Sequence, residues 1–252
     1  MDTFFIISLF LIAVFTEYID GSVGMGYGTT LAPILIVLGF EPIHVILSVI
    51  VSQLIADLAM SIMNHLFGNA NFSPKSTDTK VSIILGSTGL IGCVIGASVA
   101  LNLPRVILTA YIGILVFSMG LLTVINVKHK ALTMRKTILL GIFASFNKSV
   151  TGGGYGPILA GVQIMLGENS KQVVARTSLA EAIVCTMSIV AYILAGVSVN
   201  YLLIIIITTG AVTATPFSAY TISKIKEKNL RKLMATVMMI LGIITIFKAF
   251  LL

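Results

Sequence analysis

The segment NKSVTGGGYGPILAGVQIMLG, residues 147–167, places a lysine and a run of glycines inside an otherwise apolar stretch. The segment DGSVGMGYGTTLAPILIVLG, residues 20–39, has nearly the same pattern, and Gly24 lies 128 positions before Gly152. At this offset both segments contain G-x-G-Y-G, and a Leu-Gly pair ends eleven residues after the last glycine. We therefore expect an internal duplication, with repeats at about 3–125 and 131–252 in a single transmembrane domain that covers 1–252.

The composition is that of an integral membrane protein, with 57% hydrophobic residues, 10% charged residues and a mean hydropathy of +1.08. Soluble domains carry about 25% charged residues, so this chain cannot cover a water-facing surface and we expect the lipid bilayer to surround it. The net charge of +7 does not indicate a nucleic-acid partner, because Lys and Arg cluster in short loops between apolar runs, as membrane topology requires. Cys93 and Cys185 lie inside apolar runs and are predicted to be small packing residues without a disulfide.

Several apolar segments reach the length of about 20 residues that a spanning helix needs. The expected spans are 43–67, 81–101, 106–125, 172–196, 200–222 and 233–252. The segments that are too short to cross are 3–16, 29–40, 137–147 and 157–167, and they form two pairs, each joined by a glycine-rich stretch. Irregular backbone at membrane depth survives only where protein or water satisfies its N–H and C=O groups. We therefore expect the short pairs inside the bundle, either as re-entrant hairpins or as broken spans.

The distribution of basic residues predicts the orientation. Loops 68–80, 126–136 and 223–232 carry Lys and Arg and fall on one side, which we expect to be the cytoplasm, with both termini outside. Equivalent loops of the two repeats lie on opposite sides, which indicates inverted repeats. The predicted fold is therefore an all-α protein of the cell membrane with two inverted repeats, each with three full spans and a pair of short helices broken at a glycine-rich loop. Such transporters bind substrate near the midplane, at the interface of the repeats.

The glycine-rich stretches are expected to lead directly into helix N-termini. Pro157 suits the first turn of a helix, and Thr29 and Thr30 suit a helix start. A helix N-terminus carries about half a positive charge, so two such ends brought together would hold an anion. The alternative is that the glycines only permit close helix packing. The expected substrate-binding residues are Gly24, Gly26, Tyr27, Gly28, Thr29, Thr30, Lys148, Gly152, Gly153, Gly154, Tyr155, Gly156 and Arg176.

Some of these side chains have a second interpretation. Lys148, expected just after a short helix, suits an anionic substrate nearby, but it also suits an acidic partner such as Asp20, its equivalent at the 128 offset. Arg176 is either an anion ligand or an interfacial residue that reaches the cytoplasmic surface. Tyr27 and Tyr155 either donate a hydrogen bond to the substrate or only fill the loop.

Acidic residues inside apolar segments are candidates for carrying a coupling proton or cation, because charge in the membrane is expensive to maintain. These candidates are Glu17, Asp20, Asp57 and Glu181. The chain has no His/Cys cluster with metal-ligand spacing, no arrangement typical of a Ser/His/Asp triad, and no G-x-G pattern in a nucleotide-binding context. We expect no metal, no cofactor and no enzymatic activity.

The segments GMGYGTTLAPILIVLG and GGGYGPILAGVQIMLG, each followed by a span, resemble the TauE/SafE family of membrane transporters, often called sulfite exporters. The family's glycine-rich loop followed by a proline matches this chain at Gly24, Gly26, Gly28 and Pro33, and again at Gly152, Gly153, Gly154, Gly156 and Pro157. The resemblance covers essentially the whole chain. It implies transport of small sulfur-containing anions such as sulfite and sulfonates.

The residues and the resemblance together predict a secondary transporter that exports a small sulfur anion by alternating access, with the substrate held at the midplane between the two glycine-rich loops. One alternative is a cation transporter or cation-coupled carrier built on the intramembrane Asp and Glu. A passive anion channel and a membrane-embedded scaffold are further alternatives.

Overall fold

The computed structural model describes residues 2–124, 133–165, 168–224 and 228–251. The regular structure in these residues is helical, and no strand occurs within them. The helices in chain order are α1 (Thr3–Val23), α2 (Tyr27–Val37), α3 (Pro42–Leu66), α4 (Thr77–Asn102), α5 (Arg105–Val124), α6 (Met134–Thr151), α7 (Tyr155–Met165), α8 (Ser170–Leu194), α9 (Tyr201–Lys224) and α10 (Lys228–Ala249).

Six of the described helices are long and apolar enough to cross a membrane, namely α1, α3, α4, α5, α8 and α9. The expected spans that correspond to α3, α4, α5, α8 and α9 are therefore confirmed. The sixth expected span, 233–252, corresponds to α10, whose described apolar stretch, Ala235–Ala249, is shorter than a full span.

The first helix of each pair is longer than predicted. We expected short helices at 3–16 and 137–147, but α1 has 21 residues and α6 has 18. The prediction was wrong because it ended each helix at the first charged or strongly polar residues. Those side chains lie inside the protein, where Glu17 and Asp20 of α1 interact electrostatically with Lys148 of α6. The helices therefore continue to the residues before Gly24 and Gly152, both of which are in the left-handed conformation.

The second helix of each pair is short, as predicted, with 11 residues in both α2 and α7. These helices begin at Tyr27 and Tyr155, two residues before the predicted starts at Thr29 and Pro157. The irregular backbone of each turn is therefore only three residues long, at 24–26 and 152–154. Glycines with positive φ bound both turns, and this conformation is readily available only to glycine.

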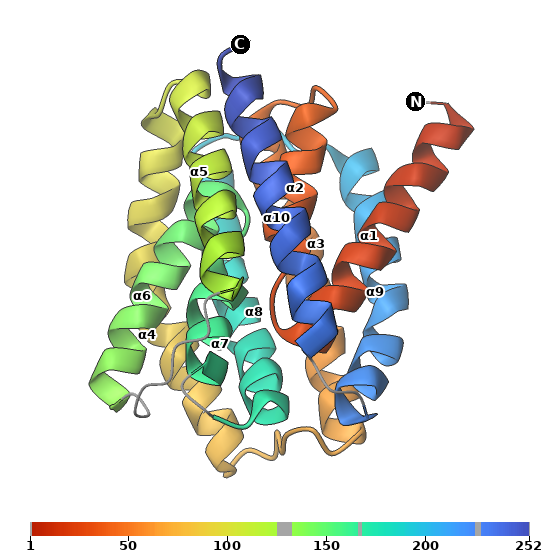
Figure 1. The fold of residues 1–252 in the computed structure, drawn as a ribbon. Helices are drawn as coiled ribbons and strands as arrows, with labels where there is room; N and C mark the ends of the chain where they lie inside the picture. Colours follow the sequence, from red (N-terminus) through yellow and green to blue (C-terminus); the bar gives the residue numbers. More distant parts are fainter. Residues whose placement is uncertain (1, 125–132, 166–167, 225–227, 252) are drawn as a thin grey trace.

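Figure 1 shows how the two helix pairs enter the bundle. The chain descends through α1 and returns through α2 to the end at which α3 begins, whereas α6 and α7 enter from the opposite end. The two termini lie at one end of the molecule, and the described connection between α3 and α4 lies at the other (Figure 1). Inverted repeats would have these directions, and the inversion itself stays a prediction. Most of the basic loop 126–136 and part of 223–232 lie outside the described residues, so their side of the membrane stays a prediction.

The helix packing has the same symmetry as the sequence repeat. When each helix of an extensively packed pair is replaced by its equivalent in the other half, the result is again a packed pair. The offset converts α1 into α6, α3 into α8, and α4 into α9. Accordingly, α1 packs on α9 as α6 packs on α4, and α3 packs on α9 as α8 packs on α4. The helices α3 and α8 pack on each other, as do α5 and α10. The centre of the bundle is therefore the place where residues at equivalent positions of the two halves can meet.

The outer surface of the helices is apolar. Large hydrophobic side chains are exposed on several of them, including Leu11, Phe15, Ile62, Ile95, Ile114, Phe143, Ile205 and Phe217. A water-soluble monomer rarely exposes so many together, and lipid is the solvent in which such a surface is stable.

Candidate functional site

The two glycine turns touch each other at the centre of the bundle. A side chain at Gly28 would overlap the carbonyl oxygen of Gly152, and a side chain at Gly156 would overlap the carbonyl oxygen of Gly24. These contacts are equivalent under the 128-residue offset. The glycines therefore allow close backbone approach, which was one interpretation of the sequence. This approach also brings the N-termini of α2 and α7 together, and the binding of an anion between them stays a prediction.

The turns are closed in this conformation. The stretches 24–30 and 149–160 are buried throughout. The predicted substrate-binding residues in them, among them Gly153 and Gly154, are therefore shielded from solvent. A Cβ at Gly153 would lie 2.5 Å from the backbone nitrogen of Thr29, so the two backbones are in van der Waals contact. An anion can bind between the turns only if they separate.

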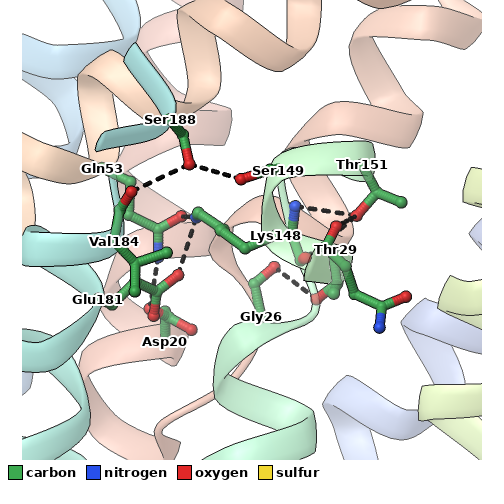
Figure 2. Close-up of polar contacts among 12 residues, drawn as sticks. Asp20, Gly26, Thr29, Gln53, Lys148, Ser149, Thr151, Glu181, Val184 and Ser188 are labelled. Atoms are coloured by element: carbon green, nitrogen blue, oxygen red, sulfur yellow. Dashed lines mark hydrogen bonds and ion pairs between the residues drawn. The ribbon is translucent and has the colours of Figure 1, made fainter. Parts of the chain in front are cut away.

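Lys148 is at the centre of the polar contacts beside these turns. It lies in the last turn of α6, and not after the helix as predicted. Its side chain is fully buried, and its ammonium forms an ion pair with Glu181 of α8, with the Nζ and Oε1 atoms 2.8 Å apart. The ammonium also donates a short hydrogen bond to Oε1 of Gln53 on α3. Figure 2 shows Lys148 pointing toward both partners.

The partners of Lys148 come from equivalent positions of the two halves. Lys148 is equivalent to Asp20 at the 128 offset, and Glu181 is equivalent to Gln53. Gln53 completes the connection, because its Nε2 donates to Oδ2 of Asp20 over 3.5 Å (Figure 2). The predicted alternative of an acidic partner for Lys148 is therefore correct, but the ion-pair partner is Glu181. Asp20 is hydrogen-bonded to Gln53, which in turn contacts Lys148.

The four acidic candidates gather around this ammonium. Glu17 and Asp20 come from α1, Asp57 from α3 and Glu181 from α8. Each of the first three interacts electrostatically with both Glu181 and Lys148. One carboxylate oxygen of Glu17 and one of Asp57 are buried without a hydrogen-bond partner in the described structure. The cluster thus has more acidic groups than cationic ones.

The two tyrosines of the turns differ in their hydrogen bonding. The Tyr27 hydroxyl forms a 2.5 Å hydrogen bond with the hydroxyl of Ser52. The Tyr155 hydroxyl is buried, has no partner among the described residues, and interacts electrostatically with Glu181 and Asp57. Position 180, which is equivalent to Ser52, is an alanine. The Tyr155 hydroxyl therefore has a hydrogen that no described group accepts, beside the acidic cluster. The Tyr27 hydroxyl is already hydrogen-bonded to Ser52.

The threonines also have separate roles. Thr29 donates to the carbonyl of Gly26 over 3.3 Å, whereas the hydroxyl of Thr30 is buried without a described partner. Thr151, which the sequence analysis did not select, accepts a 3.1 Å hydrogen bond from the backbone N–H of Gly153 (Figure 2). Gln53 was missed as a site residue too, although its equivalence to Glu181 is visible in the sequence.

Arg176 has an acidic partner of its own outside the glycine turns. Its guanidinium pairs with Asp78 at the start of α4, with Nη2 and Nε each 2.5 Å from Oδ1. The other oxygen of Asp78 accepts from the backbone N–H of Asn71. Of the two sequence interpretations, this placement favours the interfacial one, at the end of the bundle where the loop 68–80 lies.

We expect Arg176→Ala to lower the free energy of unfolding by about 1–3 kcal/mol, because the pair is largely shielded from solvent and its loss leaves Asp78 without a cation. Sulfur-anion affinity should stay within about twofold of wild type. Denaturation in detergent and ligand titration measure the two effects. Arg105→Ala is the matched control, since the Arg105–Glu41 pair has side chains 42% and 40% exposed and should contribute less than about 1 kcal/mol. Loss of affinity at unchanged stability would make Arg176 a ligand.

Cys93 and Cys185 are buried free thiols. Within the part of the chain that is described, no three His, Cys, Asp or Glu side chains are grouped so that they would hold a metal ion.

Comparisons with known proteins identify the kind of protein that carries this site. The family model "Sulfite exporter TauE/SafE" matches residues 9–245. A relative in Bacillus subtilis (strain 168), "Probable membrane transporter protein YtnM", is 26% identical over 226 residues, covering 84% of this chain and 73% of the relative. No solved structure matches. The protein is therefore a multi-pass membrane transporter and not an enzyme, and the chain belongs to the sulfite exporter TauE/SafE family.

Proposed function

We propose that this protein is a secondary transporter that exports small sulfur-containing anions, such as sulfite or sulfonates, by alternating access. The observation that carries the proposal is the fully buried ammonium of Lys148, located where equivalent residues of the two halves meet and beside the N-termini of α2 and α7. A buried ammonium is stable only with anionic or strongly polar partners. A site that can exchange one such partner for another suits anion transport.

The substrate would bind when the two glycine turns move apart. Separation exposes the first backbone N–H groups of α2 and α7, which have no partner within their own helices. These N–H groups, the positive ends of the two helix dipoles and the Lys148 ammonium would then surround an oxyanion. The left-handed glycines Gly24 and Gly152 join these helix starts to α1 and α6, so a change of φ and ψ at them would move the turns.

The acidic cluster supports proton coupling. Glu17, Asp20, Asp57 and Glu181 surround the same ammonium, and an anion placed there would be repelled by every carboxyl that is ionised. Anion binding therefore requires that some of these groups carry protons. In this proposal the cluster supplies the coupling proton, and the direction of net flux follows the combined anion and proton gradients.

The acidic cluster also supports a second candidate, a cation transporter. Two carboxylate oxygens in it, one on Glu17 and one on Asp57, have no hydrogen-bond partner among the described residues, and a monovalent cation is an alternative source of compensation. The family relationship and the two converging helix N-termini favour the anion.

Flux into proteoliposomes tests the proposal. Purified protein should catalyse saturable movement of labelled sulfite or a sulfonate such as sulfoacetate, and unlabelled sulfur anions should compete while acetate should not. The variant Lys75→Met, at an exposed lysine of the loop between α3 and α4, should match wild type. Uptake of sodium or protons with no anion requirement would establish the cation transporter instead.

A further inference from the structure

We propose that the Glu181 carboxylate occupies the place of the substrate on Lys148 in this conformation, and that the arriving anion displaces it and leaves one proton on Glu181. The inference rests on the proposed function and specifies its coupling mechanism. One anion and one proton would then bind together and leave together.

The geometry of the ion pair is the first support. The Lys148 side chain is fully buried, the Glu181 side chain is 5% exposed, and the charged atoms lie 2.8 Å apart. A carboxylate presents negatively charged oxygens to the ammonium, as a sulfite or sulfonate group would. Glu181 is therefore a tethered anion at the cationic centre of the site, and a free anion must compete with it.

The comparison of the two halves is the second support. Gln53 occupies the position equivalent to Glu181 and also contacts the ammonium. The Gln53 side chain has the same length as that of a glutamate, but its amide carries no charge and does not titrate. Of these two symmetry-related partners of Lys148, only Glu181 can change its charge when it is displaced.

The titratable groups around Glu181 determine whether its carboxyl binds a proton once it is displaced from Lys148. Every helix packed against α8 near Glu181 contributes a titratable group that interacts electrostatically with it or with its neighbours. These groups are Glu17 and Asp20 on α1, Asp57 on α3, Cys93 on α4, Lys148 on α6, Tyr155 on α7 and Cys185 on α8 itself. Lys148 supplies the positive charge in this set.

A Glu181 carboxylate that has lost Lys148 to the substrate would be surrounded by acidic groups and by the bound anion. An uncompensated buried carboxylate is so unfavourable that it binds a proton instead. The proton comes from the water of the compartment to which the site is open, and a new O–H bond forms on Glu181. The Tyr155 hydroxyl, which has no partner in the part of the chain that the structure describes, can donate to an oxygen of the substrate or of Glu181. On release the O–H bond breaks, and the carboxylate returns to Lys148.

The first test uses the wild-type protein. When sulfoacetate is titrated into purified protein in weak buffer near neutral pH, the protein should take up about one proton per anion bound, measured with a pH indicator. The apparent affinity should rise about tenfold for each unit by which the pH is lowered, as linkage to a single proton requires. Anion binding without proton uptake would overturn the inference whatever the variants do.

The second test is Glu181→Gln. The variant keeps the shape of the side chain but loses the competing charge and the exchangeable proton. We expect about tenfold tighter anion binding, with proton uptake per anion abolished, while exchange of labelled for unlabelled anion across the vesicle persists. Glu168→Gln, at the acidic residue just before α8, is the control and should retain wild-type proton uptake.

The outcomes separate the inference from the function. A wild-type protein that moves no sulfur anion contradicts the proposed function. A wild-type protein that moves the anion, together with a Glu181→Gln variant that moves it with unchanged proton uptake, contradicts only the role of Glu181. Size-exclusion chromatography of the variant verifies that it is folded.

Discussion

Replacing Lys148 with methionine should reduce sulfur-anion flux by about 100-fold or more, because the substrate loses its one charged partner and the charge-assisted hydrogen bonds that it provides. The same change should destabilise the protein by about 3–5 kcal/mol, since Glu181 stays buried without the cation that pairs with it. Flux into proteoliposomes and thermal denaturation in detergent measure the two effects.

A double variant separates these two effects. Lys148→Met combined with Glu181→Met replaces the ion pair with apolar side chains of similar volume, a change that is often neutral or stabilising in proteins. We expect the double variant to regain most of the lost stability and to remain inactive. A folded double variant with near wild-type flux would contradict the assignment of Lys148 to the substrate.

Replacing Gly28 or Gly156 with alanine should be the second largest change. The added methyl group would overlap a backbone carbonyl oxygen, that of Gly152 for position 28 and that of Gly24 for position 156. Backbone cannot rotate away as a side chain can, so the two turns would be held apart. We expect a loss of stability of at least about 1–3 kcal/mol, as for other overpacked cores, and a loss of most flux because the closed state no longer forms.

The control for the glycine variants is Gly141→Ala in α6. The new methyl group there would meet the Leu85 side chain at 3.6 Å, an ordinary van der Waals distance, so flux and stability should stay near wild type. Thermal denaturation and flux on the three variants provide the comparison. If Gly28→Ala and Gly156→Ala behaved like Gly141→Ala, the contact between the two turns would have no role in transport.

The helical class and the break points could be predicted because they depend on local chemistry. Charge depletion predicts a membrane protein, and a run of glycines predicts a turn wherever it occurs. The ends of α1 and α6 could not be predicted in the same way. Their last turns contain Asp20 and Lys148, and a charged residue ends a membrane helix or extends it according to whether another side chain compensates the charge.

Most residues of the candidate site could be predicted from local chemistry as well, but the contacts between them could not. Lys148, the glycine turns and the acidic residues could be selected as buried polar groups in apolar segments, but their partners could not. The link from Lys148 to Glu181 spans 33 residues and the link to Gln53 spans 95, and local patterns do not report contacts over such separations. For Arg176 the sequence left a ligand role and an interfacial role open, and its contact with Asp78 favours the second.

The sequence by itself determined that this is a helical membrane protein whose two halves carry the same glycine turn, because hydropathy and backbone flexibility are properties of short segments. The tertiary structure alone decided which charges meet. The interaction of one ammonium with several carboxyls depends on distance and burial, and helices far apart in the chain set both. The folded chain was therefore needed to identify Glu181, and not Asp20, as the acidic partner of Lys148.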